Sequence, residues 1–177
     1  MNGREAMLEA SEKVSGSYVE KEANAWENSP FRWIKFIPSS RRRGAAAEKL
    51  VEAWLKLQGF DVRSSGKSDA DRLVNGSYVE IKMSTPWSGV SYRFQQIRDQ
   101  NYDYVLLLGL SPDEAHVSFV PKKVLMERPE GVGGQHGGSS ASDTAWLAFD
   151  PLEPPRWLKH WGGTADEGIE VIRRELL

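Results

Sequence analysis

The 177-residue chain contains no cysteine, which excludes disulfide bonds and thiolate metal sites. No apolar run approaches the ~18 residues that a membrane-spanning helix needs. The N-terminus also lacks the basic and then apolar pattern of a signal peptide. These absences predict a soluble, cytoplasmic protein without a membrane partner. The length suits one domain with a sizeable core, and no internal repeat is present.

A surplus of charge of one sign is also lacking. Lys and Arg total 23 against 25 Asp and Glu, which gives a formal net charge of -2. This balance is no global sign of a nucleic-acid partner, although affinity for phosphate depends on where the charges lie. The one dense basic run is Arg41-Arg42-Arg43, and such a run is equally typical of a solvated surface.

The apolar spacing predicts an α/β domain around a mixed sheet. The clearest helix covers residues 44–57, where Ala47, Leu50, Val51 and Trp54 form one buried face before a stop at Gly59. We expect residues 1–38 to be an N-terminal arm or peripheral helix and residues 39–177 to be the main domain. The other expected elements are strands at 60–63, 104–108, 115–120 and 145–149, a helix over 90–100, and a last helix opened by a capping box at 164–167.

A hairpin is predicted by Asn75-Gly76, the strongest short-range signal for a two-residue turn. Continuing its register outward sets Asp71 opposite Glu80 and Asp69 opposite Lys82. Because side chains alternate along a strand, these four side chains share one face. Val79 and Ile81 project on the other face and are expected to face a core.

Opposed carboxylates repel one another, since directly paired Cβ atoms lie about 4.5–5.5 Å apart. A divalent cation between Asp71 and Glu80 would offset this cost, and Mg²⁺ prefers such oxygen ligands. We therefore expect the two carboxylates to converge on a metal-sized gap. Lys82 beside it could orient a water or stabilise a phosphate. The competing interpretation is an ordinary solvated strand whose ion pairs contribute little.

Asp71 followed by Glu80-Ile81-Lys82, after a helix with Glu48, resembles the PD-(D/E)XK nuclease superfamily. The proline of the motif is absent, since Ala70 precedes Asp71. The resemblance covers about residues 30–125, more weakly 136–146. It implies a restriction-endonuclease-like core, a central mixed sheet flanked by helices. It also implies a catalytic set of Asp71, Glu80, Lys82 and Glu48. Mg²⁺, or Mn²⁺ in its place, would be bound by the three carboxylates and the backbone carbonyl of Ile81.

Double-stranded DNA is the substrate that the resemblance implies. Some nucleases of the superfamily have a glutamine helix after the lysine, so Gln95 and Gln96 are candidates on the helix expected over 90–100. The Gln-x-x-x-Tyr spacing of recombination nucleases is not met. The candidate DNA-binding residues are Arg41, Arg42, Arg43, Ser84, Thr85, Gln95, Gln96 and Arg98, with Arg93 in addition. Weaker candidates are Trp87 and His136, for which packing and a surface position are the more common roles.

The expected activity is metal-dependent hydrolysis of DNA phosphodiester bonds by a restriction-type endonuclease, acting as a homodimer. One alternative is a junction resolvase or repair nicking enzyme on the same fold. Another is a non-catalytic DNA-binding or assembly protein, although such a protein needs no opposed carboxylates. A third is an unrelated α/β protein with a solvated hairpin. No segment of the sequence identifies itself as the reader of DNA bases.

Overall fold

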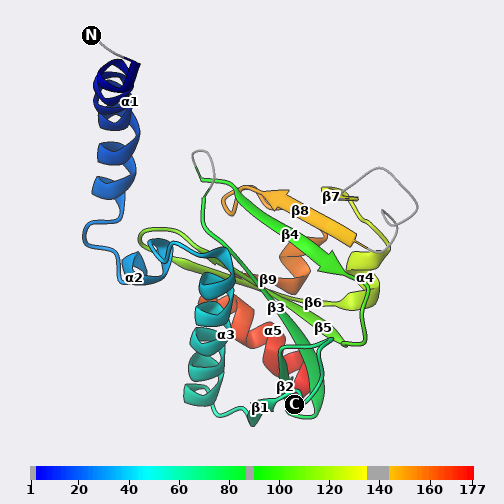
Figure 1. Cartoon of the computed structure of the whole chain (residues 1–177). Coiled ribbons are helices and arrows are strands. Elements are labelled where there is room, and N and C mark those ends of the chain that lie inside the picture. The colour runs from blue at the N-terminus through cyan, green and yellow to red at the C-terminus, as the bar shows by residue number, and fades with distance from the viewer. Residues whose placement is uncertain (1–2, 87–89, 135–143) are drawn as a thin grey trace.

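The computed structural model describes residues 3–86, 90–134 and 144–177. Its strands form two sheets (Figure 1). In chain order the elements are α1 (Gly3–Ala25), α2 (Arg32–Lys35), α3 (Ser40–Leu57), β1 (Val62–Ser64), β2 (Arg72–Val74), β3 (Ser77–Ser84), β4 (Tyr92–Arg98), β5 (Tyr104–Leu110), β6 (Ala115–Pro121), α4 (Lys122–Met126), β7 (Val132–Gly134), β8 (Thr144–Phe149), the 3₁₀-helix η1 (Leu158–Trp161), β9 (Gly162–Thr164) and α5 (Ala165–Leu176).

The central sheet is mixed, as the sequence predicts. Its strands lie in the order β1-β2-β3-β5-β6-β9, and β4-β8-β7 form a smaller sheet. Strands β3 and β5 pair in parallel, whereas the other neighbours in the central sheet are antiparallel. Strand β4 belongs to the connection between β3 and β5, so the small sheet lies beside the parallel pair.

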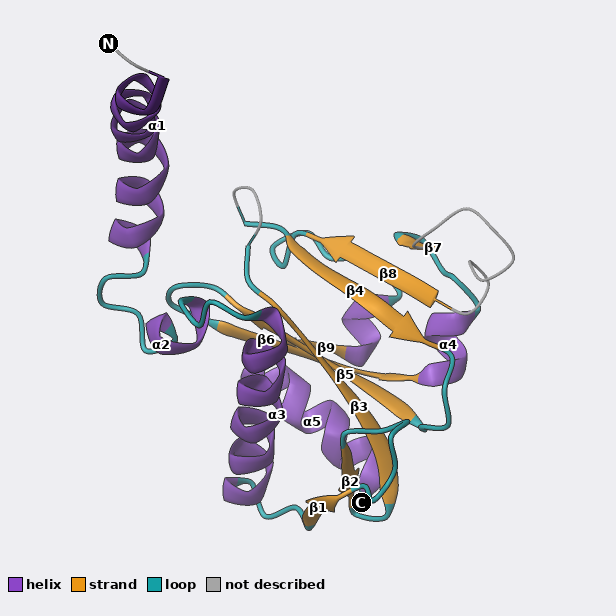
Figure 2. Ribbon diagram, in the orientation of Figure 1, coloured by secondary structure: helices purple, strands orange, loops and turns teal. Residues whose placement is uncertain are grey.

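The elements form three layers (Figure 2), with an apolar core between each pair of neighbouring layers. On one face of the central sheet, Val79 and Ile81 of β3 pack with Val51 of α3 and Ile172 of α5. On the other face, Leu107 of β5 belongs to a cluster with Tyr92 and Phe94 of β4 and Leu147 of β8. The central sheet therefore has α3 and α5 on one side and the small sheet with α4 on the other.

Helix α3 begins at Ser40, four residues earlier than its apolar pattern indicates. The side chain of Ser39 caps it by accepting a hydrogen bond from the N–H of Arg42 at 3.4 Å. The basic run Arg41–Arg43 therefore lies within the first turn, not before the helix as the sequence suggests. The stop is as predicted, because Gly59 adopts a φ of +90° just after the helix.

The prediction of a helix over residues 90–100 is wrong, because Tyr92–Arg98 within this segment form strand β4. Tyr92 and Phe94 are buried two positions apart, as in a strand, and Ile97 is buried after a register shift. The Phe94–Ile97 spacing of three resembles a helical period, and this β-bulge allows both residues to be buried in a strand. The predicted strands at 104–108, 115–120 and 145–149 and the last helix are present as β5, β6, β8 and α5.

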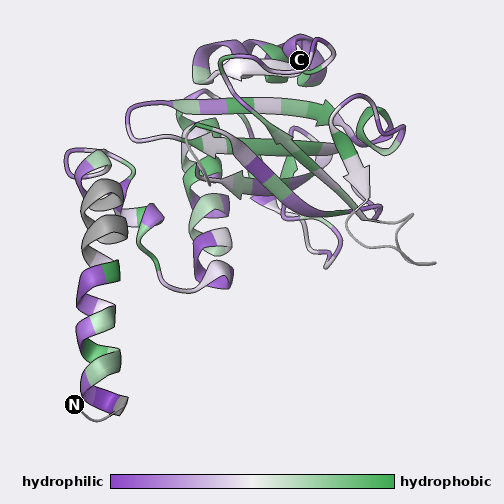
Figure 3. Ribbon diagram, turned by 90° about the horizontal axis from the view of Figure 1, so that it is seen from above, coloured by the Kyte–Doolittle hydropathy of each residue, from purple (hydrophilic) through white to green (hydrophobic). Residues whose placement is uncertain are grey.

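Helix α1 stands apart from both sheets in two views (Figures 1 and 3). Residues 4–15 are all exposed, and their colouring in Figure 3 mixes hydrophilic and hydrophobic positions. The next segment is anchored, since Trp26 and Ile34 are buried. Within the described ranges, no helix has the length and apolar character needed to cross a membrane.

Candidate active site

The hairpin has the predicted register next to its turn. Val74 pairs with Ser77 and Leu73 with Tyr78, and Asn75 and Gly76 have φ values of +46° and +90°. Two positive φ angles are what a type I′ turn requires. The ladder ends at Arg72, the first residue of β2, so the strand pairing does not extend to Asp71 or Asp69.

Asp71 continues the ladder with its side chain. Its N–H donates to the carbonyl of Val79 at 3.0 Å, and its carboxylate Oδ2 accepts the N–H of Ile81 at 2.7 Å. The side chain thus takes the place of the backbone carbonyl that a longer β2 would offer. Because the N–H and C=O of a strand residue point to the same side, the Ile81 carbonyl also lies on the Asp71 side of β3.

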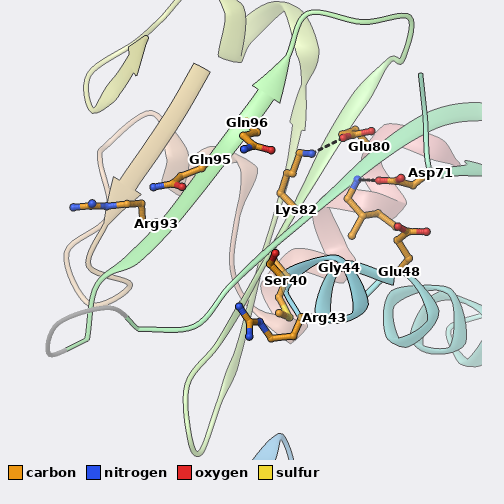
Figure 4. A pocket seen from close by; sticks show the side chains of 12 residues that line it. Ser40, Arg43, Gly44, Glu48, Asp71, Glu80, Lys82, Arg93, Gln95 and Gln96 are labelled. Carbon is orange, nitrogen blue, oxygen red and sulfur yellow. Dashed lines mark hydrogen bonds and ion pairs between the residues drawn. The ribbon is translucent and has the colours of Figure 1, made fainter. Parts of the chain in front are cut away.

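A polar cleft of about 470 Å³ lies between α3, β3 and β4 (Figure 4). It brings together all four residues of the predicted catalytic set, and in Figure 4 Lys82 lies between Glu80 and Gln96. Its full lining is Ser40, Arg43, Gly44, Glu48, Asp71, Glu80, Ile81, Lys82, Met83, Arg93, Gln95 and Gln96. Asp69 is outside this lining, and its carboxylate accepts a hydrogen bond from Ser68 Oγ at 3.0 Å.

Glu80 and Lys82 form an ion pair inside the cleft. Lys82 Nζ is 2.7 Å from Glu80 Oε1, and the Glu80 side chain is only 12% exposed. Burial raises the pKa of Glu80 and the adjacent ammonium lowers it, whereas the charges of Asp71 and Glu48 raise it further. The net shift is upward, so the lysine does not fully compensate the burial and the two other carboxylates.

Arg72, which the sequence analysis did not single out, links two sides of the cleft. Its Nη1 donates to Glu48 Oε2 at 3.0 Å and to the carbonyl of Asp71 at 2.7 Å, while Nε donates to Glu52 Oε2 at 2.8 Å. The pKa of Glu48 is nevertheless raised, first by burial and then by the charge of Asp71. Glu48 and Glu52 lie one helical turn apart on α3, a spacing that could have indicated a shared partner.

The structure gives the basic candidates different positions. Arg43 lines the cleft and donates through Nη1 to the carbonyl of Ile37 at 2.7 Å. Arg41 and Arg42 are exposed on the first turn of α3, and Arg98 is exposed at the end of β4, outside the cleft.

Ser84 and Thr85 are engaged within the protein. The Ser84 hydroxyl is buried, accepts the N–H of Arg93 at 2.8 Å and donates to the Thr85 carbonyl at 3.2 Å. Thr85 Oγ1 accepts a hydrogen bond from Lys35 at 3.2 Å. These two hydroxyls therefore join β3 to β4 and α2. Trp87 and His136 lie outside the described residues.

The types of donor in the cleft fit a hard divalent cation, because three residues with carboxylate side chains line one space. Among the residues that the structure describes, however, no three acidic or histidine side chains converge closely enough to hold a metal ion as they stand. The carboxylates instead have separate partners: Lys82 for Glu80, Arg72 for Glu48 and the Ile81 amide for Asp71. Binding of one cation by all three carboxylates would require their side chains to move closer together.

No protein-family model matches the chain, and no curated protein matches it. Among solved structures the chain is similar to that of a bacterial homing endonuclease, I-Ssp6803I. The two share 13% sequence identity with a TM-score of 0.48, over 76% of this chain and 93% of the other. This distant similarity assigns neither a family nor an activity to the chain.

Proposed function

We propose that the chain is a metal-dependent endonuclease that hydrolyses DNA phosphodiester bonds in the cleft. One observation carries this proposal: Glu48, Asp71 and Glu80 reach the same cleft from three separate segments, beside Lys82. Burial and mutual repulsion raise the pKa of two of these carboxylates. Such a concentration of like charge is a cost to the fold, and clustered groups with perturbed pKa values are typical of functional sites.

Asp71, Glu80 and Glu48, with the carbonyl of Ile81, are the groups that would hold Mg²⁺ or Mn²⁺. When bound, the cation would lower the pKa of an attacking water and neutralise charge on the scissile phosphate. The hydrogen bond from the Ile81 N–H to Asp71 fixes the backbone of β3 at this point. The carboxylate of Asp71 and the carbonyl of Ile81 are thereby held on one side of the strand.

Lys82 has two roles in the proposed reaction when Glu80 binds the cation and no longer pairs with the lysine. Its ammonium can donate hydrogen bonds to the non-bridging oxygens of the phosphate, where negative charge develops in the transition state. The ammonium can also position the attacking water, whereas help in deprotonating that water would need the neutral amine form of the side chain. The side chain is only 25% exposed, so its interaction with a phosphate would be less weakened by solvent than that of a surface lysine.

Double-stranded DNA is the substrate that we propose. Arg43 lines the cleft at the first turn of α3, and Arg41 and Arg42 lie on the same turn. This helix end adds its own positive potential to the arginines, and no acidic residue lies in its first turn. The charges support contacts to phosphates, which would make binding strongly dependent on salt.

We further propose that cleavage is of the restriction type and that the enzyme acts as a homodimer. Cutting both strands of a duplex at one position is simplest with two equivalent active sites, which a two-fold dimer provides. Discrete fragments from a plasmid would support this finer proposal. Sedimentation of the protein with and without DNA would test the dimer.

The test of the main proposal is incubation of supercoiled plasmid with the protein in Mg²⁺, Mn²⁺ or EDTA at low salt. We expect nicked or linear products with either metal and none in EDTA. Asp71→Ala and Lys82→Ala variants should be inactive but should still bind DNA. Equal activity in the wild type and both variants would refute the assignment of the site. No cleavage of any DNA form with either metal would refute the enzymatic proposal.

A further inference from the structure

The exposed positions of β4 have a distinctive composition. Its buried residues are Tyr92, Phe94 and Ile97, which belong to the core under the small sheet. Every other position of the strand is exposed and is either arginine or glutamine: Arg93, Gln95, Gln96 and Arg98. The neighbouring strand β8 contains no acidic residue, and neither does β4.

The β-bulge brings this row onto one side of the strand. Gln95 and Gln96 together oppose Trp146 of β8, because the register shifts between Phe94 and Ile97. Without the bulge, strict alternation along the same sequence would place Ile97 beside Arg93 and Gln95 on the outer face. The bulge returns Ile97 to the core and adds a second outward glutamine.

The bulge is held in a conformation that glutamine adopts at a cost. Gln96 has a φ of +55°, a region that glycine occupies without the steric penalty of a Cβ. Strained backbone of this kind persists mainly where a functional side chain is needed, and bulges are frequent beside active sites. Gln96 also lines the cleft with Gln95 and Arg93, so the strained residue lies next to the carboxylates.

Resting on the proposed function, we propose that the outer face of the β4–β8 ribbon reads bases in the major groove of duplex DNA. The groove admits a two-stranded ribbon, arginine pairs with O6 and N7 of guanine, and glutamine pairs with N6 and N7 of adenine. At about 3.3 Å per residue, the row from Arg93 to Arg98 extends roughly 15 Å, or about four base pairs. The residues on β8 opposite the arginines are small, Ala148 and Thr144, and leave room for base edges.

The position of the row fits this role. Because Arg93, Gln95 and Gln96 line the cleft, a duplex whose phosphate reaches Lys82 would present its adjacent bases to β4. The glutamines would then contact bases, in place of the DNA backbone contacts expected of a glutamine helix. The arginines on the first turn of α3 would supply the sequence-independent part of the affinity.

The test is selection of bound duplexes from a randomised pool in Ca²⁺, a cation of the same oxygen-ligand class. The wild type should enrich a preferred sequence. Gln95→Ala, Gln96→Ala and Arg98→Ala should each lose the preference at one position by about 5- to 150-fold. The matched control, Arg41→Ala, should weaken binding to all sequences equally and reduce the slope of log affinity against log salt by about 0.9. Gln96→Gly, which suits the positive φ, keeps the test valid if the alanine variants do not fold.

A second measurement identifies the groove. Replacing each guanine of the preferred duplex with 7-deazaguanine removes the N7 acceptor of the major groove. This should weaken the wild type at the arginine-read position and leave Arg98→Ala or Arg93→Ala unaffected there.

The outcomes separate the two proposals. A wild type that cuts plasmid in Mg²⁺ but enriches no sequence, or variants that keep the wild-type preference, would overturn base reading and leave the enzymatic proposal intact. A preference that the variants lose, in a protein that does not cleave, would support base reading and refute the enzyme. Absence of duplex binding would overturn both.

Discussion

Replacing Asp71 in two ways separates the two interactions of its carboxylate. One oxygen accepts the N–H of Ile81 at 2.7 Å, while the negative charge raises the pKa of Glu48 and Glu80. Asp71→Asn keeps an oxygen acceptor and removes the charge. Asp71→Ala removes both and leaves the Ile81 amide without its partner, in a residue that is 7% exposed.

The size of each effect follows from this geometry. An unsatisfied buried amide destabilises a protein by about 1–3 kcal/mol, which is about 3–10 °C in Tm for a domain of this length. Asp71→Ala should therefore melt below Asp71→Asn by roughly that interval. Asp71→Asn should match or exceed the wild type at pH 7, because it removes a repulsive charge from beside two half-buried carboxylates.

The raised pKa values of Glu48 and Glu80 determine how the stability gain from Asp71→Asn changes with pH. The pKa values of Glu48 and Glu80 in the folded protein lie above the ordinary 4.5. Stability from the neutral forms is therefore fully present below about pH 4.5 and is lost as pH rises through the folded pKa values. Any gain from Asp71→Asn should accordingly be larger at pH 7 than at pH 4.

Thermal unfolding of the wild type and both variants at pH 4, 5.5 and 7 is the assay. If Asp71→Asn were as unstable as Asp71→Ala at pH 7, neither the amide acceptor nor the repulsion would act as described.

Three further predictions follow from the same contacts. Arg72→Met should destabilise the fold by about 1–3 kcal/mol in urea unfolding, because charged hydrogen bonds to two glutamates and a carbonyl are lost; an unchanged midpoint would contradict this. Lys82→Met should raise the pKa of Glu80 still further, since the lysine now lowers it; a carboxyl-carbon NMR titration with no upward movement would refute the ion pair. Gln96→Gly should leave stability unchanged or raise it by up to about 1 kcal/mol, because relief of the positive φ outweighs the extra chain entropy; clear destabilisation would show that the bulge is not strained.

Local features could be predicted from the sequence. The Asn75-Gly76 turn alone fixes the register of the hairpin through Arg72. The apolar stripe of α3 buries Ala47 and Val51 and so places Glu48 at the edge facing the cleft. Both follow from geometry within a few residues, where turn type and side-chain period determine the result.

Features that depend on tertiary packing could not be predicted from the sequence. The spacing of Phe94 and Ile97 favours a helix, but the bulge at Gln96 accommodates the same spacing in strand β4. Arg72 reaches Glu48, 24 positions away, only because β2 packs beside α3. The separate partners of the three carboxylates likewise depend on the assembled cleft. The hairpin register alone could not show that each carboxylate has a partner of its own.

The most direct test of the central claim compares Asp71→Asn with Asp69→Asn in metal-dependent plasmid cleavage. Both variants remove one carboxylate from the segment before β2, but only Asp71 lines the cleft. With wild-type protein as reference, single-turnover cleavage in Mg²⁺ should fall by at least about 100-fold for Asp71→Asn. Asp71 is proposed to bind the cation directly, and the loss of a group that only orients a metal ligand already costs about 10- to 100-fold. The rate should stay within about two-fold of the wild type for Asp69→Asn. Equal rates for the two variants would contradict the proposed active site.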